Sequence, residues 1–156
     1  MNYCTETEIQ VALARYYDYL QCLVVPNVEL PYEMDLVVLS KSGYASEIEI
    51  KISLPDLRKD AGKRHSHDFC CNRNLIKQLW FAIPESMDFA KALPFIPENA
   101  GIYVITDQGY VLTKRKPKIN ALAKQWDENG YMKLARLAMI KLWSLKIKCL
   151  SNGGKE

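Results

Sequence analysis

The sequence predicts a single domain of the α/β or α+β class, and three observations predict it. A helical pattern occupies residues 5–20, two pairs of apolar runs joined by short turns occupy 33–53 and 100–118, and a further helical stretch follows. The length of 156 residues, with 49% hydrophobic and 25% charged residues, suits one sizeable core. We therefore expect one domain over residues 1–150 and a frayed tail at 151–156.

Composition and charge narrow the class of protein. The net charge of +3 permits a nucleic-acid partner without requiring one. The first ten residues lack the basic and apolar segments of a secretion signal, and no apolar run approaches the roughly 18 residues that span a membrane. Five cysteines, an odd number, argue against a disulfide framework. We expect a reduced, cytoplasmic protein without a membrane partner.

The chain begins with a predicted helix and a predicted strand. Apolar residues recur at helical spacing through 5–20, and Thr5 with Glu8 forms the T-x-x-E pattern of a capping box. Residues 22–30 are apolar and predict a first strand, in which Pro26 marks an edge position or a bulge.

The stretch 33–53 predicts a β-hairpin whose second strand is charged on one face. Residues 46–52 alternate strictly, so that Glu47, Glu49 and Lys51 share that face. A solvated face is the ordinary reason for such alternation, because antiparallel sheets often bury only one side. Glu47 lies nearer the turn than Glu49, so that its side chain has a peripheral role or is simply solvated.

The turn of this hairpin decides which residues oppose each other. The Lys-Ser-Gly sequence at 41–43 suits a three-residue loop with its glycine in the left-handed conformation, which sets Val37 opposite Glu47 and Asp35 opposite Glu49. Directly opposed carboxylates repel each other, so this pairing does not stabilise the fold. It does suit a divalent cation, because two carboxylates at this separation can share one Mg²⁺. The lysine two residues after Glu49 can then reach a phosphate or polarise a water molecule.

The remaining elements are predicted from apolar runs and turn residues. We expect a short helix at 55–63, a buried strand at 78–85, a short helix before residue 100, and a hairpin at 100–118 turning at Asp-Gln-Gly. Two helices separated at Asn129-Gly130 should follow. The apolar residues of the last helix are expected in the core: Leu134, Leu137, Ile140 and Leu145.

A polar and basic segment follows the charged strand directly. Four of its residues are predicted to contact phosphates, and two histidines are candidate substrate contacts: Arg58, Lys59, Lys63, Arg64, His65 and His67. A solvated loop explains the segment as well. Zinc is a third interpretation, since His65, His67, Cys70 and Cys71 are possible ligands, but adjacent cysteines do not form the usual C-x(2–4)-C pair.

The spacing of Asp35, Glu49 and Lys51 matches the pattern D-x(n)-(D/E)-x-K, and here the sequence resembles the PD-(D/E)XK nuclease superfamily. Met34 stands where the superfamily name has proline. The runs EIKISLPDLRKDAGKRHSHD, LWFAIPE and PENAGIYVITDQGYVLTKRKPK are similar to the MmcB-like group of DNA-repair-related and phage proteins, over roughly residues 33–118. The resemblance implies a restriction-endonuclease-like mixed sheet with an α-β-β-β-α-β core.

The resemblance also implies a set of site residues. Asp35 and Glu49 would bind Mg²⁺ or Mn²⁺ together with the backbone carbonyl of Ile50, and Lys51 would orient or deprotonate the attacking water. Glu8 would contact the metal directly or through water, although a capping-box role explains that residue equally well.

The expected function is therefore metal-dependent hydrolysis of DNA phosphodiester bonds, in repair, recombination or the processing of phage and mobile-element DNA. A homodimer would suit a double-strand cut, which needs two active sites. Two alternatives stay open: a DNA-binding module of the same fold without catalysis, and a small zinc-binding interaction domain.

Overall fold

The computed structural model describes residues 5–29, 32–61 and 74–152. The predictions for Lys63, Arg64, His65 and His67, and for zinc ligands at Cys70 and Cys71, lie outside the described residues. None of the described helices is long and apolar enough to span a membrane. The elements follow in the order α1 (Glu6–Tyr16), β1 (Leu23–Glu29), β2 (Glu33–Leu39), β3 (Ala45–Ile50), α2 (Leu54–Asp60), β4 (Ile76–Pro84), α3 (Phe89–Ala92), a 3₁₀ turn (Leu93–Phe95), β5 (Gly101–Ile105), β6 (Val111–Arg115) and α4 (Glu128–Asn152).

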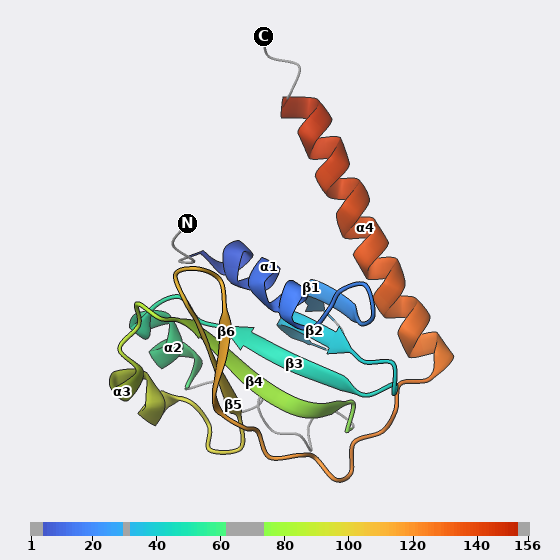
Figure 1. Ribbon diagram of the computed structural model, residues 1–156. Coiled ribbons are helices and arrows are strands. Elements are labelled where there is room, and N and C mark those ends of the chain that lie inside the picture. Colours follow the sequence, from blue (N-terminus) through green and yellow to red (C-terminus); the bar gives the residue numbers. More distant parts are fainter. Residues whose placement is uncertain (1–4, 30–31, 62–73, 153–156) are drawn as a thin grey trace.

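The six strands form one mixed sheet in sequence order, from β1 to β6 (Figure 1). β1, β2 and β3 pair antiparallel, β4 is parallel to both β3 and β5, and β6 returns antiparallel. β4 lies in the middle of the sheet, and its near-continuous apolar sequence is typical of a strand covered on both faces. The predicted mixed α/β class is confirmed.

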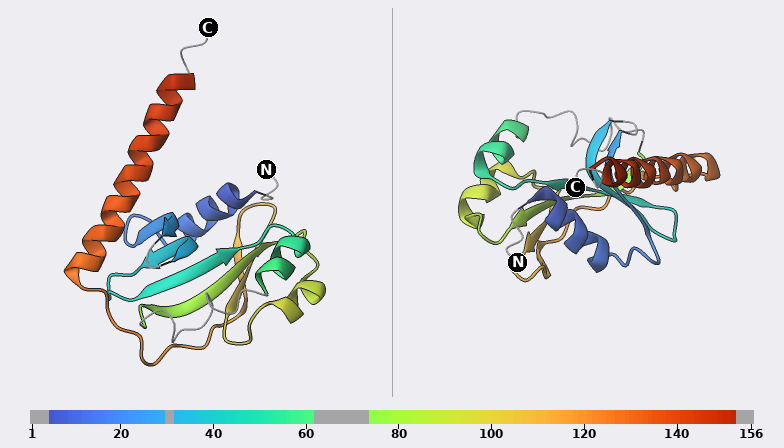
Figure 2. Two further views of the ribbon diagram at one scale, coloured as in Figure 1. Left: turned by 180° about the vertical axis from the view of Figure 1, so that it is seen from behind. Right: turned by 90° about the horizontal axis from the view of Figure 1, so that it is seen from above.

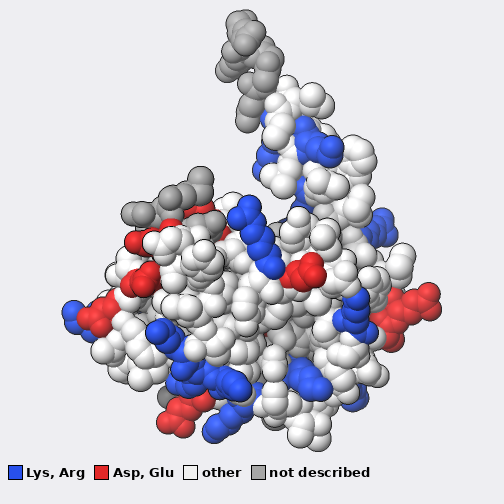
Figure 3. Space-filling model, viewed as in Figure 1, with Lys and Arg blue, Asp and Glu red and all other residues white. Residues whose placement is uncertain are grey.

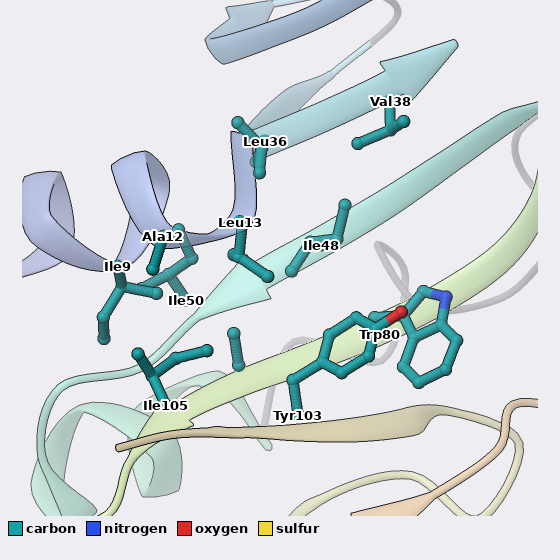
Figure 4. Packing of buried hydrophobic residues seen from close by; sticks show 11 residues of the cluster. Ile9, Ala12, Leu13, Leu36, Val38, Ile48, Ile50, Trp80, Tyr103 and Ile105 are labelled. Carbon is teal, nitrogen blue, oxygen red and sulfur yellow. The ribbon is translucent and has the colours of Figure 1, made fainter. Parts of the chain in front are cut away.

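One face of the sheet is covered by α1. Ile9 and Leu13 on its buried side pack against Ile48 and other apolar residues of β2 to β5, as Figure 4 shows. The rings of Trp80 and Tyr103 stack within this cluster, with centroids 3.9 Å apart. The helix begins at a complete capping box, in which Thr5 and Glu8 bond each other's backbone N–H, as the sequence predicted.

The opposite face carries two separate apolar clusters. α2 and α3 cover the first, where Leu57 packs with Phe81 and Ile102. The start of α4 covers the second, where Leu134 packs with Val25 and its neighbours on β1 and β2. Figure 2, seen from above, places α1 and α2 on different sides of the sheet. The charged residues of β3 lie between these two clusters.

The predicted hairpin register is confirmed. Gly43 has φ +78°, so the loop uses the left-handed glycine that a three-residue connection requires. The Ser40 N–H donates to the Tyr44 carbonyl at 3.1 Å, and Val37 pairs with Glu47.

The prediction for the C-terminal region is wrong in three respects. A single helix, α4, replaces two, because Asn129 and Gly130 lie in its first turn, where the Gly130 N–H donates to the Asp127 carboxylate at 2.7 Å. Of the predicted core residues, Leu134 is buried and Leu137 is partly buried against the same cluster. Ile140 and Leu145 are exposed because the helix runs beyond the sheet (Figures 1 and 2). The helix also continues to Asn152, past the boundary predicted for the frayed tail.

Candidate active site

Asp35 and Glu49 come from adjacent antiparallel strands. The ladder pairs Leu36 with Ile48, and the same register extended by one residue sets Asp35 across from Glu49. The Asp35 carboxylate accepts a hydrogen bond from the backbone N–H of Ile50 at 2.7 Å. This bond fixes the Asp35 side chain beside β3. The role predicted for the Ile50 carbonyl as a metal ligand stays a prediction.

The Lys51 amine lies among three carboxylates. Its Nζ is 3.0 Å from Glu49 Oε2 and 3.8 Å from Asp35 Oδ2, so the two opposed acids meet at one point, as the sequence predicted. The third carboxylate is Asp60, in the last turn of α2, whose Oδ2 is 3.6 Å from the amine. The sequence interpretation missed Asp60, because only the packing of α2 on the sheet brings it to β3.

The charged face of β3 is buried, which excludes the solvated-face interpretation. Glu47 is 1% exposed, and Glu49, Lys51 and Asp60 are each 6–7% exposed. Glu47 and Glu49 are buried because they share a face of the sheet with Leu79 and Phe81 of β4, and helices cover that face. An ion cluster at this depth is costly unless its members compensate one another.

Glu47 has a partner that the sequence did not suggest. Tyr32, just before β2, donates its phenolic hydrogen to Glu47 Oε2. The other oxygen, Oε1, is buried without a hydrogen-bond partner among the described residues. Two ionised carboxylates cannot bond each other, whereas a proton on Glu47 would join it to neighbouring Glu49. Burial, and repulsion from Glu49, raise the pKa of Glu47 well above its ordinary value, while the hydrogen bond from Tyr32 opposes the shift.

Asp35 and Lys51 also have shifted pKa values. Burial and then repulsion from Glu49 raise the pKa of Asp35 to about 7, against the opposing influence of the Ile50 N–H and the Lys51 charge. For Lys51, burial favours the neutral amine, but attraction to Glu49 and Asp35 outweighs it and raises the pKa of the amine above its ordinary value. The lysine is therefore a cation at neutral pH, and Asp35 changes its protonation there.

The acid of α1 that acts on this cluster is Glu6. The Glu8 carboxylate accepts from the backbone N–H and the hydroxyl of Thr5, which confirms its capping role and leaves its metal role a prediction. Repulsion from Glu6, in contrast, contributes to the raised pKa of Asp35. Gln10 links Glu6 to Asp35, because its side-chain amide donates to Glu6 Oε1 at 2.9 Å and to the Asp35 backbone carbonyl at 3.2 Å.

The donor set fits a cation with few protein ligands. Asp35 and Glu49 each place a carboxylate oxygen near the Lys51 amine, and oxygen is the ligand that Mg²⁺ and Mn²⁺ prefer. Within the described ranges, no group of three or more His, Cys, Asp or Glu side chains is arranged as a complete metal cage. In proteins Mg²⁺ usually keeps several waters and binds through one or two carboxylates and substrate phosphates.

Two of the predicted DNA contacts lie on α2 beside this cluster. Arg58 and Lys59 are exposed residues of the last turn, immediately before Asp60. The Arg58 guanidinium lies over the ring of Phe95, 5.2 Å from its centroid, which restrains the side chain at the surface. One turn of helix therefore presents a carboxylate inward and two cations outward.

Comparison with known proteins shows a likeness of fold alone. No protein-family model matches the chain, and no curated protein matches it. Among solved structures, the chain is similar to the SPO1766 protein of unknown function from Silicibacter pomeroyi, with a TM-score of 0.61 and 14% sequence identity. The likeness covers 97% of this chain and 94% of that protein, so it extends over the sheet and its helices.

Proposed function

We propose that this protein is a metal-dependent nuclease of the PD-(D/E)XK type that hydrolyses DNA phosphodiester bonds. The observation that carries the proposal is the meeting of Asp35 and Glu49 at the Lys51 amine, within 3.8 Å and 3.0 Å. Two like charges directly opposed in a buried cluster oppose folding, so the fold gains nothing from the pair itself. Binding of a catalytic cation between the two carboxylates would explain why the pair is present.

The order of elements supports a restriction-endonuclease-like core. The resemblance implies α-β-β-β-α-β, and the chain runs α1, β1, β2, β3, α2, β4. The antiparallel β2–β3 pair followed by parallel β4 is consistent with this core.

The residues of the chain would act as follows. Asp35 and Glu49 would hold Mg²⁺ or Mn²⁺, and the bound ion supplies Lewis-acid activation of water and of the scissile phosphate. Lys51 remains protonated, because its pKa is raised. It therefore orients the attacking water and stabilises the charge that develops on the phosphate, and does not serve as a general base.

The substrate would be held by cations around the site. Arg58 and Lys59 lie on the exposed side of the turn that carries Asp60, where they can contact phosphates of the DNA backbone. We place the protein in DNA repair, recombination or mobile-element DNA processing on the resemblance alone.

A cleavage assay tests this proposal. The protein is incubated with a panel of labelled duplex, single-stranded, flap and junction DNA in Mg²⁺, Mn²⁺ or EDTA. We expect cleavage in the two cations, none in EDTA, and none by Asp35→Asn or Glu49→Gln. Glu33→Gln is the matched control, because it removes an exposed acid from the same strand. Metal-independent cleavage, or full activity of both variants, would contradict the proposal.

The burial of Lys51 favours one second candidate, DNA binding without cleavage, in which the ion cluster only stabilises the fold. Binding of the same DNA panel that is indifferent to EDTA, with no product in any cation, would identify this second function.

A further inference from the structure

The outer part of α4 projects beyond the sheet. Every residue from Leu142 to Leu150 is exposed, and Figures 1 and 2 show the helix rising past α1 and β1. We call residues 139–150 the projecting helix. It exposes seven large apolar side chains by 43–81% of their surface: Met139, Ile140, Leu142, Trp143, Leu145, Ile147 and Leu150.

The apolar residues lie on two sides of the projecting helix. Ile140, Trp143, Ile147 and Leu150 follow the 3-4-3 spacing that helices use when they pack against other helices. Leu142 and Leu145 lie across the helix from this row, and lysines separate the two apolar sides: Lys146 on one flank, Lys141 and Lys148 on the other. A helix that is apolar over so much of its circumference is normally buried by protein on more than one side.

An unsupported segment of this kind is not expected to persist alone. Twelve residues are about the length at which isolated helices are marginal in water. A flat membrane surface would cover only one of the two apolar sides, and nucleic acid phosphates would cover neither. The pattern therefore favours a protein partner.

The distribution of charge along the chain indicates which protein surface the projecting helix binds. From residue 129 to 152 the sequence has five basic residues and no acid. Figure 3 accordingly shows only uncharged and basic residues along the projecting helix. The N-terminal layer, formed by α1, β1 and the segment that joins them, with the start of β2, has the opposite charge. Residues 5–33 hold one base, Arg15, and five acids: Glu6, Glu8, Asp18, Glu29 and Glu33.

The N-terminal layer is also apolar in part. Val11, Tyr19 and Leu20 are 42–77% exposed there, close in sequence to exposed Asp18. A basic apolar helix and an acidic apolar surface on one chain are complementary. These three side chains are exposed although α4 contacts β1 in the same layer.

We infer that the protein forms a two-fold dimer in which the projecting helix of each copy packs on the acidic N-terminal layer of the other. Reciprocal packing is the ordinary form of a two-fold interface, in which each surface meets its complement twice. At roughly 80–100 Å² for each exposed apolar side chain, the row of Ile140, Trp143, Ile147 and Leu150 offers about 320–400 Å². Each copy also buries its N-terminal layer in the second, reciprocal contact, which adds to its share of an interface whose standard size is roughly 800 Å² per partner.

Sedimentation and light scattering of the full chain test the dimer. We expect a concentration-dependent dimer for the wild type and a monomer for Trp143→Glu with Ile147→Glu, whose folding is checked by circular dichroism. Leu122→Glu is the matched control, since it places a charge at another exposed leucine. Interfaces of this size have dissociation constants from picomolar to micromolar. A wild type that stays monomeric up to about 100 μM would therefore overturn the inference. An unchanged dimer in the double variant would also overturn it.

A charge exchange tests where the helix packs. Lys146→Glu with Lys148→Glu in one chain, and Glu29→Lys with Glu33→Lys in another, should each weaken self-association at least tenfold. Mixing the two variants should restore dimers, because both interfaces again join opposite charges. Lys114→Glu with Lys116→Glu serves as the control for charge alone. Failure of the mixture to associate would overturn this packing, as would vesicle binding by a wild-type monomer.

Discussion

Lys51 is the residue on which the candidate site depends electrostatically. Its amine lies within 3.0–3.8 Å of Glu49, Asp60 and Asp35 and is almost wholly buried. Removing the cation of a buried ion cluster leaves its carboxylates without a counter-charge. The resulting loss of folding free energy is larger than the net contribution of the intact cluster to stability. The same lysine can therefore serve both the fold and the reaction, and substitutions have to separate the two roles.

Asp35→Asn and Glu49→Gln should fold normally without metal, or gain up to about 1 kcal/mol, because each relieves repulsion between opposed acids. Both should lose the stabilisation by excess Mg²⁺ that follows when a ligand binds only the folded state. Thermal melts with and without Mg²⁺ measure both effects.

Asp60→Asn is the matched control for these two variants. It removes a buried carboxylate that also contacts Lys51 but does not belong to the opposed pair, so the Mg²⁺-induced shift should remain. A wild type that shows neither a metal-dependent shift nor cleavage would contradict the nuclease proposal.

Lys51→Ala should behave differently from all three acid variants. Without metal it should destabilise the protein by about 3–5 kcal/mol at neutral pH, because the remaining carboxylates lose their counter-charge. Mg²⁺ should still bind and recover part of the stability, while cleavage falls by at least a hundredfold. Denaturant unfolding with and without Mg²⁺, beside a cleavage assay, measures the two effects. If Mg²⁺ recovered none of the stability that Lys51→Ala loses, Asp35 and Glu49 would not share a cation.

At the scale of elements, two glycines have opposite roles. Gly101 begins β5, and a Cβ there would lie 2.3 Å from the Trp80 ring, which is itself stacked on Tyr103. Gly130 lies in the first turn of α4, where its N–H bonds Asp127, so its backbone is already fixed. The first glycine is required by packing between neighbouring strands, and the second is not required by helix geometry.

Gly101→Ala should therefore destabilise the protein by about 1–3 kcal/mol, because the Trp80 ring must move within a packed layer. Gly130→Ala should change stability by less than about 1 kcal/mol, since alanine favours the helix while its Cβ crowds the Asp127 cap at 3.2 Å. Equal effects in denaturant unfolding would contradict the packing of Trp80 against β5.

At the scale of the whole molecule, the buried acids make stability depend on pH. The pKa of Asp35 rises from an ordinary value near 4 in the unfolded chain to about 7 in the folded protein, so the folded state holds more protons between these values. Its contribution is fully present below the unfolded pKa and is lost as pH rises through about 7. The raised pKa of Lys51 acts in the same sense but only at strongly alkaline pH.

The metal-free protein should therefore become less stable as pH rises from about 5 to about 8, in the sense that linkage requires. Mg²⁺ should stabilise it more at the higher pH, because the cation competes with the proton on Asp35. Asp35→Asn should flatten the pH dependence. A metal-free wild type that gains stability over this range would contradict the assigned direction.

The sequence by itself determined the local structure of the site. Its strict alternation at 46–52 and its Lys-Ser-Gly turn set the register, and through it placed Asp35, Glu49 and Lys51 on one face, because strand period and turn type are local properties. The capping box of Thr5 and Glu8 was predictable for the same reason.

Only the tertiary structure decided what surrounds that face. Packing of α2 brought Asp60 to Lys51, and the Tyr32 hydroxyl met Glu47, through contacts between elements that no periodicity encodes. The helical layer also turned a strand that alternation alone could have left in solvent into a buried ion cluster. α4 shows the converse, because its apolar pattern predicted a core position while the sheet ends beneath it and leaves Ile140 and Leu145 exposed. The spacing of apolar and polar residues assigns a side chain to one face of a helix or strand. Whether that face is buried depends on what the rest of the chain packs against it.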